Sequence, residues 1–136
     1  MKGVQFTDNS GQAMSAFRQA AARALEKCGL TAEGYAKKLC PVAPVDGGGL
    51  RNSIAHKVDP EALEAYIGTN VEYAAYVELG TGKFYPGGRP TPWRYQDAKG
   101  NWHTTQGQRA QPYLKPAIED HAQTYRNIIR DEMEGK

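Results

Sequence analysis

The sequence predicts the α+β class: long N-terminal and C-terminal helices packed on a small antiparallel sheet, with a short middle helix and a long Gly/Pro/aromatic loop that carries a hairpin. Apolar residues recur every three or four positions near both ends of the chain, and short alternating segments bounded by turn residues fill its middle. The 136 residues show no internal repeat and suffice for one hydrophobic core. We therefore expect a single domain over residues 1–136.

The first predicted helix carries one apolar stripe with spacings of three and four residues. The stripe consists of Met14, Phe17, Ala21, Ala24, Cys28, Ala32, Tyr35 and Leu39. The helix should end at Cys40, because the residue before a proline avoids helical backbone angles. Gly29 could break the helix midway. If one helix carries both cysteines, Cys28 and Cys40 lie about 18 Å apart, which is too far for a disulfide.

A glycine run, Gly47-Gly48-Gly49, follows that helix. It lacks the Lys-Ser/Thr ending of a phosphate-binding loop, and we expect a strand after it rather than the start of a helix. The run therefore predicts a turn rather than an anion site. In that turn, Gly48 should adopt a backbone conformation that is closed to residues with a side chain.

Two hairpins are predicted in the middle of the chain. Alternating residues at 50–58 and 63–70 flank an Asp-Pro turn and form the first, and residues 93–96 and 101–104 flank an Asp-Ala-Lys-Gly turn and form the second. Between them, residues 71–82 predict a short helix that Gly80 closes in the left-handed conformation, with a strand as the alternative.

The last predicted helix follows Pro112 and places Leu114, Ile118, Ala122, Tyr125 and Ile129 at helical spacing. Before it, residues 82–109 form a long connection that contains the second hairpin. A connection of this length in a compact domain is usually functional or disordered. We expect residues 82–109 to be mobile in the free protein.

The net charge of +2 is unevenly distributed. Residues 50–80 contain two basic and five acidic side chains, whereas residues 81–111 contain five basic and one acidic. The basic side chains of the second segment are Lys83, Arg89, Arg94, Lys99 and Arg109, and they alternate with Trp93, Tyr95 and Trp102. A solvated loop is the simplest interpretation, and a small nucleic-acid-binding module that uses residues 83–109 is the alternative.

No constellation of catalytic or metal-binding residues is evident. His56, His103 and His121 fall on separate predicted elements, and the two cysteines form no metal-binding pair. Glu72 and Glu78 would lie on opposite sides of a helix, as solvated or interface charges. An enzyme would need a pocket that gathers Glu78, His103 and Arg109. We predict no catalytic activity, no metal and no cofactor.

The chain has no apolar run of about 18 residues and no apolar core near its start, so we predict neither a membrane span nor a signal peptide. Two cysteines that cannot pair fit a reducing cytoplasm. We therefore expect the protein to be made in a cytoplasm.

Three sequence blocks carry a family resemblance. They are PVDGGGLRNSI at residues 44–54, EYAAYVELGT at residues 72–81 and AQPYLKPAI at residues 110–118. In order and spacing they resemble the tail-component family of long-tailed bacteriophages and prophages. The matching positions are Pro44, Asp46, Gly48, Leu50, Arg51, Ser53, Tyr73, Ala74, Tyr76, Val77, Glu78, Gly80, Thr81, Ala110, Pro112, Tyr113, Leu114, Pro116 and Ala117. Gly47 stands where that family usually has Thr, which should loosen the turn.

The resemblance implies a structural protein of the phage neck or tail, without enzymatic activity, that acts in tail completion and head–tail joining. Its implied partners are other neck and tail proteins, such as the tail tube and the head–tail connector. It implies a homo-oligomeric ring in the virion, a possible monomer when free, and the host cytoplasm as the place of assembly. Neither a membrane nor nucleic acid is expected as a partner. Most matching residues should determine the fold, whereas Glu78 and Thr81 should contact a partner.

Overall fold

The computed structural model describes residue 3 and residues 7–42, 48–97 and 99–135. It contains helices and two small antiparallel sheets, which confirms the α+β class. In chain order the elements are α1 (Ser10–Leu39), α2 (Gly49–Ser53), β1 (Ala55–Asp59), β2 (Glu64–Gly68), α3 (Ala74–Leu79), the 3-10 helix η1 (Gly82–Phe84), β3 (Trp93–Gln96), β4 (Trp102–Thr105), α4 (Leu114–Glu119) and α5 (Ala122–Met133).

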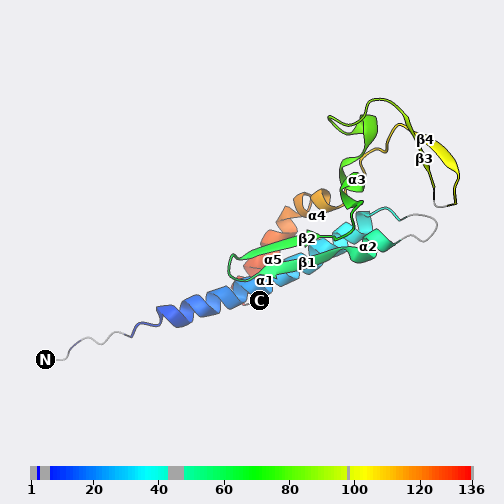
Figure 1. Cartoon of the computed structure of the whole chain (residues 1–136). Coiled ribbons are helices and arrows are strands. Elements are labelled where there is room, and N and C mark those ends of the chain that lie inside the picture. The colour runs from blue at the N-terminus through cyan, green and yellow to red at the C-terminus, as the bar shows by residue number, and fades with distance from the viewer. Residues whose placement is uncertain (1–2, 4–6, 43–47, 98, 136) are drawn as a thin grey trace.

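Helix α1 is the spine of the molecule. Its 30 residues span about 45 Å, and its apolar stripe packs against the β1–β2 hairpin, α4 and α5. The N-terminal part of α1 projects beyond these elements, and η1 with the β3–β4 hairpin projects from the opposite end (Figure 1). Gly29 does not break the helix. A Cβ atom added at Gly29 would lie 2.8 Å from Cδ2 of His56, so this glycine lets β1 pack closely on α1.

Both predicted hairpins are present, and each forms a separate two-stranded sheet. In the first, Ala55 pairs with Gly68 and Asp59 with Glu64; in the second, Trp93 pairs with Thr105. The strand expected from residue 50 is shorter than predicted, because residues 50–53 belong to α2. The hydroxyl of Ser53 donates to the carbonyl oxygen of Leu50 at 2.6 Å within that turn.

The expectation that a strand follows the glycine run is wrong, because α2 begins at Gly49. The expected conformation of Gly48 is confirmed: its φ is 93°, a region that residues with a side chain rarely adopt. The amide of Asn52 donates to the carbonyl oxygen of Gly48 at 2.8 Å and closes the turn. Pro44, Asp46 and Gly47 lie outside the described residues.

The single C-terminal helix expected from the sequence is two helices. The chain bends at Asp120 and His121, between α4 and α5. The ring of His121 stacks on that of Tyr35 with centroids 3.5 Å apart, and the hydroxyl of Tyr125 donates to the carbonyl oxygen of Ala117 at 2.5 Å. These contacts hold the bend and lay α5 along α1.

The main buried cluster lies where α1, α2, α3 and α4 meet. Tyr113 is 0% exposed, and its hydroxyl donates to the carbonyl oxygen of Ala74 at 3.4 Å. The cluster consists of Ala36, Cys40, Leu50, Ile54, Ala74, Tyr113 and Ala117. All three sequence blocks thus contribute to one core. Cys28 and Cys40 are buried free thiols, as the predicted distance requires.

Candidate assembly surfaces

The connection between α3 and α4 forms an arm, residues 81–109, that projects from the body (Figure 1). At its root, residues 81–83 run antiparallel to residues 106–108. The amide of Thr81 donates to the carbonyl oxygen of Gln108 at 2.9 Å, and the amide of Lys83 donates to that of Gln106 at 3.1 Å. The hydroxyl of Thr81 also accepts from the amide of Gln108 at 2.9 Å. Backbone pairing therefore fixes the place where the arm leaves the body.

Glycines allow the two sides of the root to touch. Gly82 and Gly107 both have positive φ, at 62° and 108°. A Cβ atom on Gly82 would lie 2.2 Å from the carbonyl oxygen of Gln106, and one on Gly107 would lie 2.2 Å from that of Thr81. No side chain fits in either place. The root is therefore a backbone-to-backbone contact.

Gly80 precedes the root and ends α3, but not in the left-handed helical conformation that the sequence suggested. Its φ is 83° and its ψ is 175°. A Cβ atom at this position would lie 2.9 Å from the backbone nitrogen of Ala110. Position 80 therefore requires glycine, because its φ is positive and the returning chain passes too close for a side chain.

Glu78 joins α3 to the start of α4. Its carboxylate accepts hydrogen bonds from the amides of Tyr113 at 2.7 Å, Leu114 at 3.0 Å and Lys115 at 2.9 Å. These amides lack partners within the helix, and the positive end of the helix dipole favours a carboxylate there. The argument that Glu78 and Thr81 have little to do in the fold is therefore wrong, because Glu78 caps α4 and Thr81 closes the root.

One indirect signal of this cap is present at the start of α4. The residue at the N-cap position of α4 is Tyr113, and its side chain makes no capping hydrogen bond. A helix without a local Ser, Thr, Asp or Asn cap needs a more distant acceptor for its first amides. Glu78 lies 35 residues from Tyr113, so no local pattern could have identified it.

The tip of the arm, β3 and β4, exposes aromatic rings with arginines beside them. The guanidinium of Arg94 lies 5.1 Å from the ring centroid of Trp102, and that of Arg89 lies 5.7 Å from the ring of Trp93. Trp102 is 59% exposed, and Tyr95 on the other face is also exposed. Lys83, Arg89, Arg94, Lys99 and Arg109, which the sequence singled out, are all exposed.

The one acidic residue in the arm is engaged within it. Asp97 contacts Nε2 of His103 at 2.7 Å, and its other carboxylate oxygen accepts from the amides of Lys99 and Asn101. The hydrogen bond from His103 and that from the Asn101 amide lower the pKa of Asp97 below its usual value. The arm therefore presents its arginines and lysines without an opposing free carboxylate in its described part.

Exposed apolar side chains, most of them aromatic, also surround the base of the arm. Tyr73, Tyr76, Leu79 and Tyr85 are exposed along α3 and η1. A shallow hollow of about 270 Å³ lies between these elements and is lined by Tyr76, Leu79 and Tyr85, among others. Partner contacts commonly use aromatic residues of this kind.

Acidic side chains gather at the opposite end of the body. The turn between β1 and β2 carries Glu61, the strand ends beside it carry Asp59 and Glu64, and the turn points away from the arm (Figure 1). Asp59 accepts from the amides of Glu61 and Ala62 and so shapes the turn. Glu61 and Glu64 are exposed. Three of the five acidic residues of the 50–80 segment thus lie far from the basic arm, whereas Glu72 and Glu78 lie near its base.

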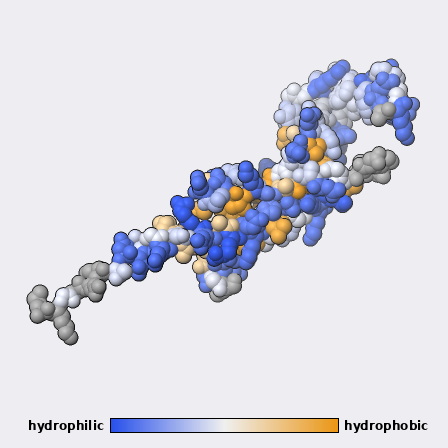
Figure 2. Space-filling model, turned by 60° about the horizontal axis from the view of Figure 1, so that its bottom comes forward, coloured by the Kyte–Doolittle hydropathy of each residue, from blue (hydrophilic) through white to orange (hydrophobic). Residues whose placement is uncertain are grey.

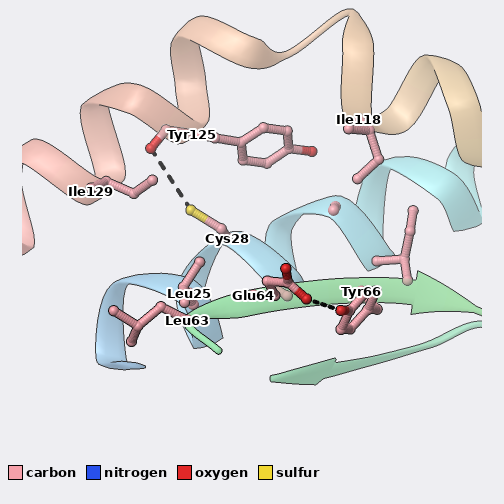
Figure 3. Close-up of a pocket in the computed structure, with 12 residues that line it drawn as sticks. Leu25, Cys28, Leu63, Glu64, Tyr66, Ile118, Tyr125 and Ile129 are labelled. Carbon is pink, nitrogen blue, oxygen red and sulfur yellow. Dashed lines mark hydrogen bonds between the residues drawn. The ribbon is translucent and has the colours of Figure 1, made fainter. Parts of the chain in front are cut away.

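An apolar groove of about 490 Å³ runs along α1 between β2 and α5 (Figure 3). Leu25, Cys28 and Ala32 form its floor, with Tyr66 and Ile129 among the walls. The thiol of Cys28 lies 3.8 Å from the carbonyl oxygen of Tyr125, and burial raises the pKa of this thiol. Figure 2 shows apolar patches on the body, whereas the tip of the arm is mainly hydrophilic.

Residues 5–80 match a protein family described as "Bacteriophage HK97-gp10, putative tail-component". The chain belongs to this HK97-gp10-like family. The match covers more than half of the chain, including the first sequence block and all of the second except Thr81, and the arm and third block lie beyond it. No curated protein and no solved structure matches the chain. Membership makes it a bacteriophage tail component, hence a protein of the virion whose partners are other tail proteins.

Each of the three residues that an enzyme would have needed has a different partner. In this HK97-gp10-like chain Glu78 caps α4, His103 contacts Asp97, and Arg109 lies 5.0 Å from the ring centroid of Phe84. Among the described residues, no group of His, Cys, Asp and Glu side chains is arranged to hold a metal ion. None of the helices in the described ranges has the length and apolarity needed to cross a membrane.

Proposed function

We propose that this tail component acts in tail completion and head–tail joining, as a subunit of a homo-oligomeric ring. Its neighbours would be the tail tube and the head–tail connector, and assembly would take place in the host cytoplasm. The observation that supports this proposal is the position of two unlike surfaces at opposite ends of the body, the basic arm and the acidic β1–β2 turn (Figure 1). A ring requires contacts in which two different surfaces of one subunit meet.

The chemistry of the arm supports a role in contacting protein. Its tip exposes tryptophan, tyrosine and arginine, the residue types that contribute most to binding energy at protein interfaces. The acidic turn offers Glu61 and Glu64 as opposite charges. Electrostatic attraction of this kind steers and orients subunits more than it holds them together. The free protein would accordingly be a monomer or a weak oligomer.

Limited proteolysis of the free protein and of assembled tails tests the proposal. Backbone pairing protects the root, so cleavage of the free protein should fall between residues 84 and 105. In assembled tails the same bonds should be protected, because neighbouring subunits would cover the arm. Equal cleavage in the two samples would contradict the proposal, and so would an arm that resists protease entirely when free.

A nucleic-acid-binding module remains the second candidate function, because Trp102 and Tyr95 are exposed beside cations. Such rings could stack on bases while the arginines contact phosphates. The guanidinium of Arg94 already lies over the Trp102 ring, which leaves one face of that ring for a base. A mobility-shift series at rising salt decides between the candidates: tight binding that weakens steeply with salt would favour nucleic acid.

A further inference from the structure

The apolar stripe of α1 extends beyond the part that its own chain covers. From Ala24 to Ala36 the stripe is buried under the hairpin, α4 and α5. Further toward the N-terminus, residues 11–19 are all exposed, and they include Met14 at 55% and Phe17 at 49%. We call Met14 and Phe17 the ridge. On an α-helix the ridge lies on the same face as Cys28 and Ala32, since the separations are close to whole turns.

The groove lies over that same face of α1. Its floor continues along α1 from the ridge, with Leu25 first and then Cys28, Gly29 and Ala32. Figure 3 shows Leu25 and Cys28 on this helix. The floor is made mostly of small residues, whereas the ridge carries two large ones. Large side chains of one helix can settle over small residues of another when two helices pack closely.

We propose that the groove of one copy receives the ridge of a second copy of this chain. The ridge cannot reach its own groove, because both lie on the unbroken helix α1. Phe17 and Cys28 are 11 residues apart along it, a distance of about 16 Å. The occupant must therefore come from another chain, and a second copy supplies a complementary surface.

Residue spacing supports a second copy as the occupant. Met14, Phe17 and Ala21 precede Leu25, Cys28 and Ala32 by the same 11 residues, about three helical turns. A parallel copy that is displaced by this offset places each of the first three residues over one of the last three. In an antiparallel arrangement about the middle of the stripe, Phe17 again faces the region of Cys28. Both arrangements bring the same two residues together.

Charge also favours this pairing. Residues 10–25 contain Arg18 and Arg23 and no acidic residue. The groove carries Glu64 in its β2 wall, and Glu61 is exposed on the adjoining turn. Arg23 already pairs with Glu132 of its own chain at 2.9 Å, whereas Arg18 donates only to the backbone carbonyl oxygen of Glu61 at 3.3 Å. An incoming ridge segment therefore brings the charge of Arg18 to a rim that carries Glu64. This complementarity helps to orient the two copies.

This inference names one contact through which the subunits of the proposed ring could meet. It rests on the ring proposal only for the order of the subunits. In a head-to-tail order each copy inserts its ridge into the next groove, and the series continues until it closes. In a reciprocal order two copies exchange ridges and the contact stops at a dimer. The groove contact is the same in both, so the two proposals can fail separately.

The native thiol of Cys28 provides a direct test with the full-length chain. Phe17→Cys places a second thiol on the ridge, and a disulfide within one chain is impossible because the two Cα atoms are about 16 Å apart on α1. Mild oxidation should give intermolecular disulfides to Cys28, identified by mass spectrometry of the linked peptides. Gln19→Cys, on the opposite face of α1, should give far less product, and Phe17→Cys with Cys28→Ser should lose the assigned linkage.

The size of the oxidised products separates the two proposals. A ladder of covalent oligomers supports both the groove contact and the head-to-tail ring. Covalent dimers alone support the groove contact and contradict a ring built through this surface. If the Phe17→Cys variant forms no more disulfide to Cys28 than the Gln19→Cys variant does, the proposal that the groove receives the ridge is wrong.

Self-association without any cross-link provides a second measurement. Phe17→Asp should weaken association, measured by sedimentation velocity over a concentration series, by about ten- to a hundredfold, as expected when a buried aromatic contact is lost. Gln19→Asp should leave association unchanged, and both variants should melt like the parent because both positions are exposed. A parent chain that stays monomeric throughout, or a Phe17→Asp variant that associates like the parent, would overturn the proposal.

Discussion

The root and the tip of the arm belong to one continuous segment, yet they are built on different principles. At the root, two glycines bring backbones into direct contact, and the neighbouring Glu78 caps the helix to which the chain returns. At the tip, two four-residue strands expose Arg94, Trp102 and other large side chains. The root is tightly constrained by the fold, whereas the tip is constrained mainly by its own hairpin.

This difference separates residues that determine the fold from residues available to a partner. Family-block residues near the root serve the fold: Tyr113 fills the core, and Thr81 closes the root. The cations of the tip make few contacts with the body. Substitutions at the root should therefore reduce the stability of the fold, whereas substitutions at the tip should mainly reduce assembly.

Removal of the Tyr113 ring should have the largest effect on stability. Tyr113→Ala empties the centre of the core and should lower the free energy of unfolding by about 3 to 5 kcal/mol. Burial raises the pKa of Tyr113 to about 12, so the neutral phenol is the relevant form at ordinary pH. Urea unfolding measures the loss. Tyr95→Ala, at the exposed tip, is the control and should change stability by less than about 0.5 kcal/mol.

Loss of the Glu78 carboxylate should have the next largest effect. Glu78→Ala leaves three amides of α4 without their acceptor and should cost about 2 to 3 kcal/mol. Glu72→Ala removes an exposed carboxylate from the same sequence block and should be nearly neutral. Thermal unfolding of both variants tests the difference. Similar losses of stability for Glu78→Ala and Glu72→Ala would show that Glu78 does not stabilise the fold.

Two glycines with positive φ sharpen the comparison further. Gly107 lies at the root, where an added Cβ would meet a backbone oxygen at 2.2 Å, and Gly100 lies at the tip, where the nearest atom would be 3.6 Å away. Gly107→Ala should cost about 2 kcal/mol and Gly100→Ala about 1 kcal/mol. Hydrogen exchange should locate the larger effect at the amides of Thr81 and Lys83. Equal losses of stability for Gly107→Ala and Gly100→Ala would contradict the close contact at the root.

A smaller, pH-dependent effect is expected in the body. His56 contacts Glu26 at 2.5 Å and Glu33 at 3.2 Å, and the hydrogen bond to Glu26, followed by that to Glu33, raises the pKa of His56. Because the pKa of His56 is higher in the folded state than in the unfolded state, its protonation stabilises the fold. This contribution is complete below the unfolded-state pKa of about 6.5 and is lost as the pH rises through the folded-state pKa. His56→Gln should therefore cost more stability at about pH 5.5 than at about pH 8.5. Glu26→Gln should reduce that difference, and an equal loss at both pH values would refute this pairing.

The tip should show the smallest effect on stability and a clear effect on assembly. Arg94→Ala and Trp102→Ala alter exposed side chains and should change the free energy of unfolding by at most about 0.5 kcal/mol. If the tip contacts a partner, both variants should lower the yield of completed tails in a complementation assay. Arg126→Ala, an exposed arginine on α5, is the matched control. Normal tail yields with both tip variants would exclude the tip as an assembly surface.

Local patterns in the sequence predicted those parts of the fold that depend on local physics. The α1 stripe and the two turns were sufficient to place the long helix and both hairpins. Helix α2 was missed because a five-residue helix leaves the same apolar positions as a strand, and the Ser53 hydroxyl bond is invisible in a pattern. The bend at Asp120 was missed because packing against Tyr35, rather than proline or glycine, fixes it.

The candidate surfaces were predictable only in composition. The sequence identified the five cations of the arm and the acidic stretch before it, but it could not show that the β1–β2 turn alone of that stretch lies at the opposite end of the body. It also assigned Glu78 to a partner, because a cap that acts across 35 residues leaves no local trace. Long-range hydrogen bonds of this kind depend on how the elements meet, which no spacing rule describes.

The contact between Gly82 and Gly107 gives the arm one further property. The chain leaves the body and returns to it at a single point, so the length of everything between residues 84 and 105 is independent of the body's own geometry. A different segment inserted between the same two glycines would be attached to the body by the same backbone contact. We therefore expect that the arm can be replaced by a different segment, with a different fit to neighbouring subunits, while the rest of the subunit stays as it is.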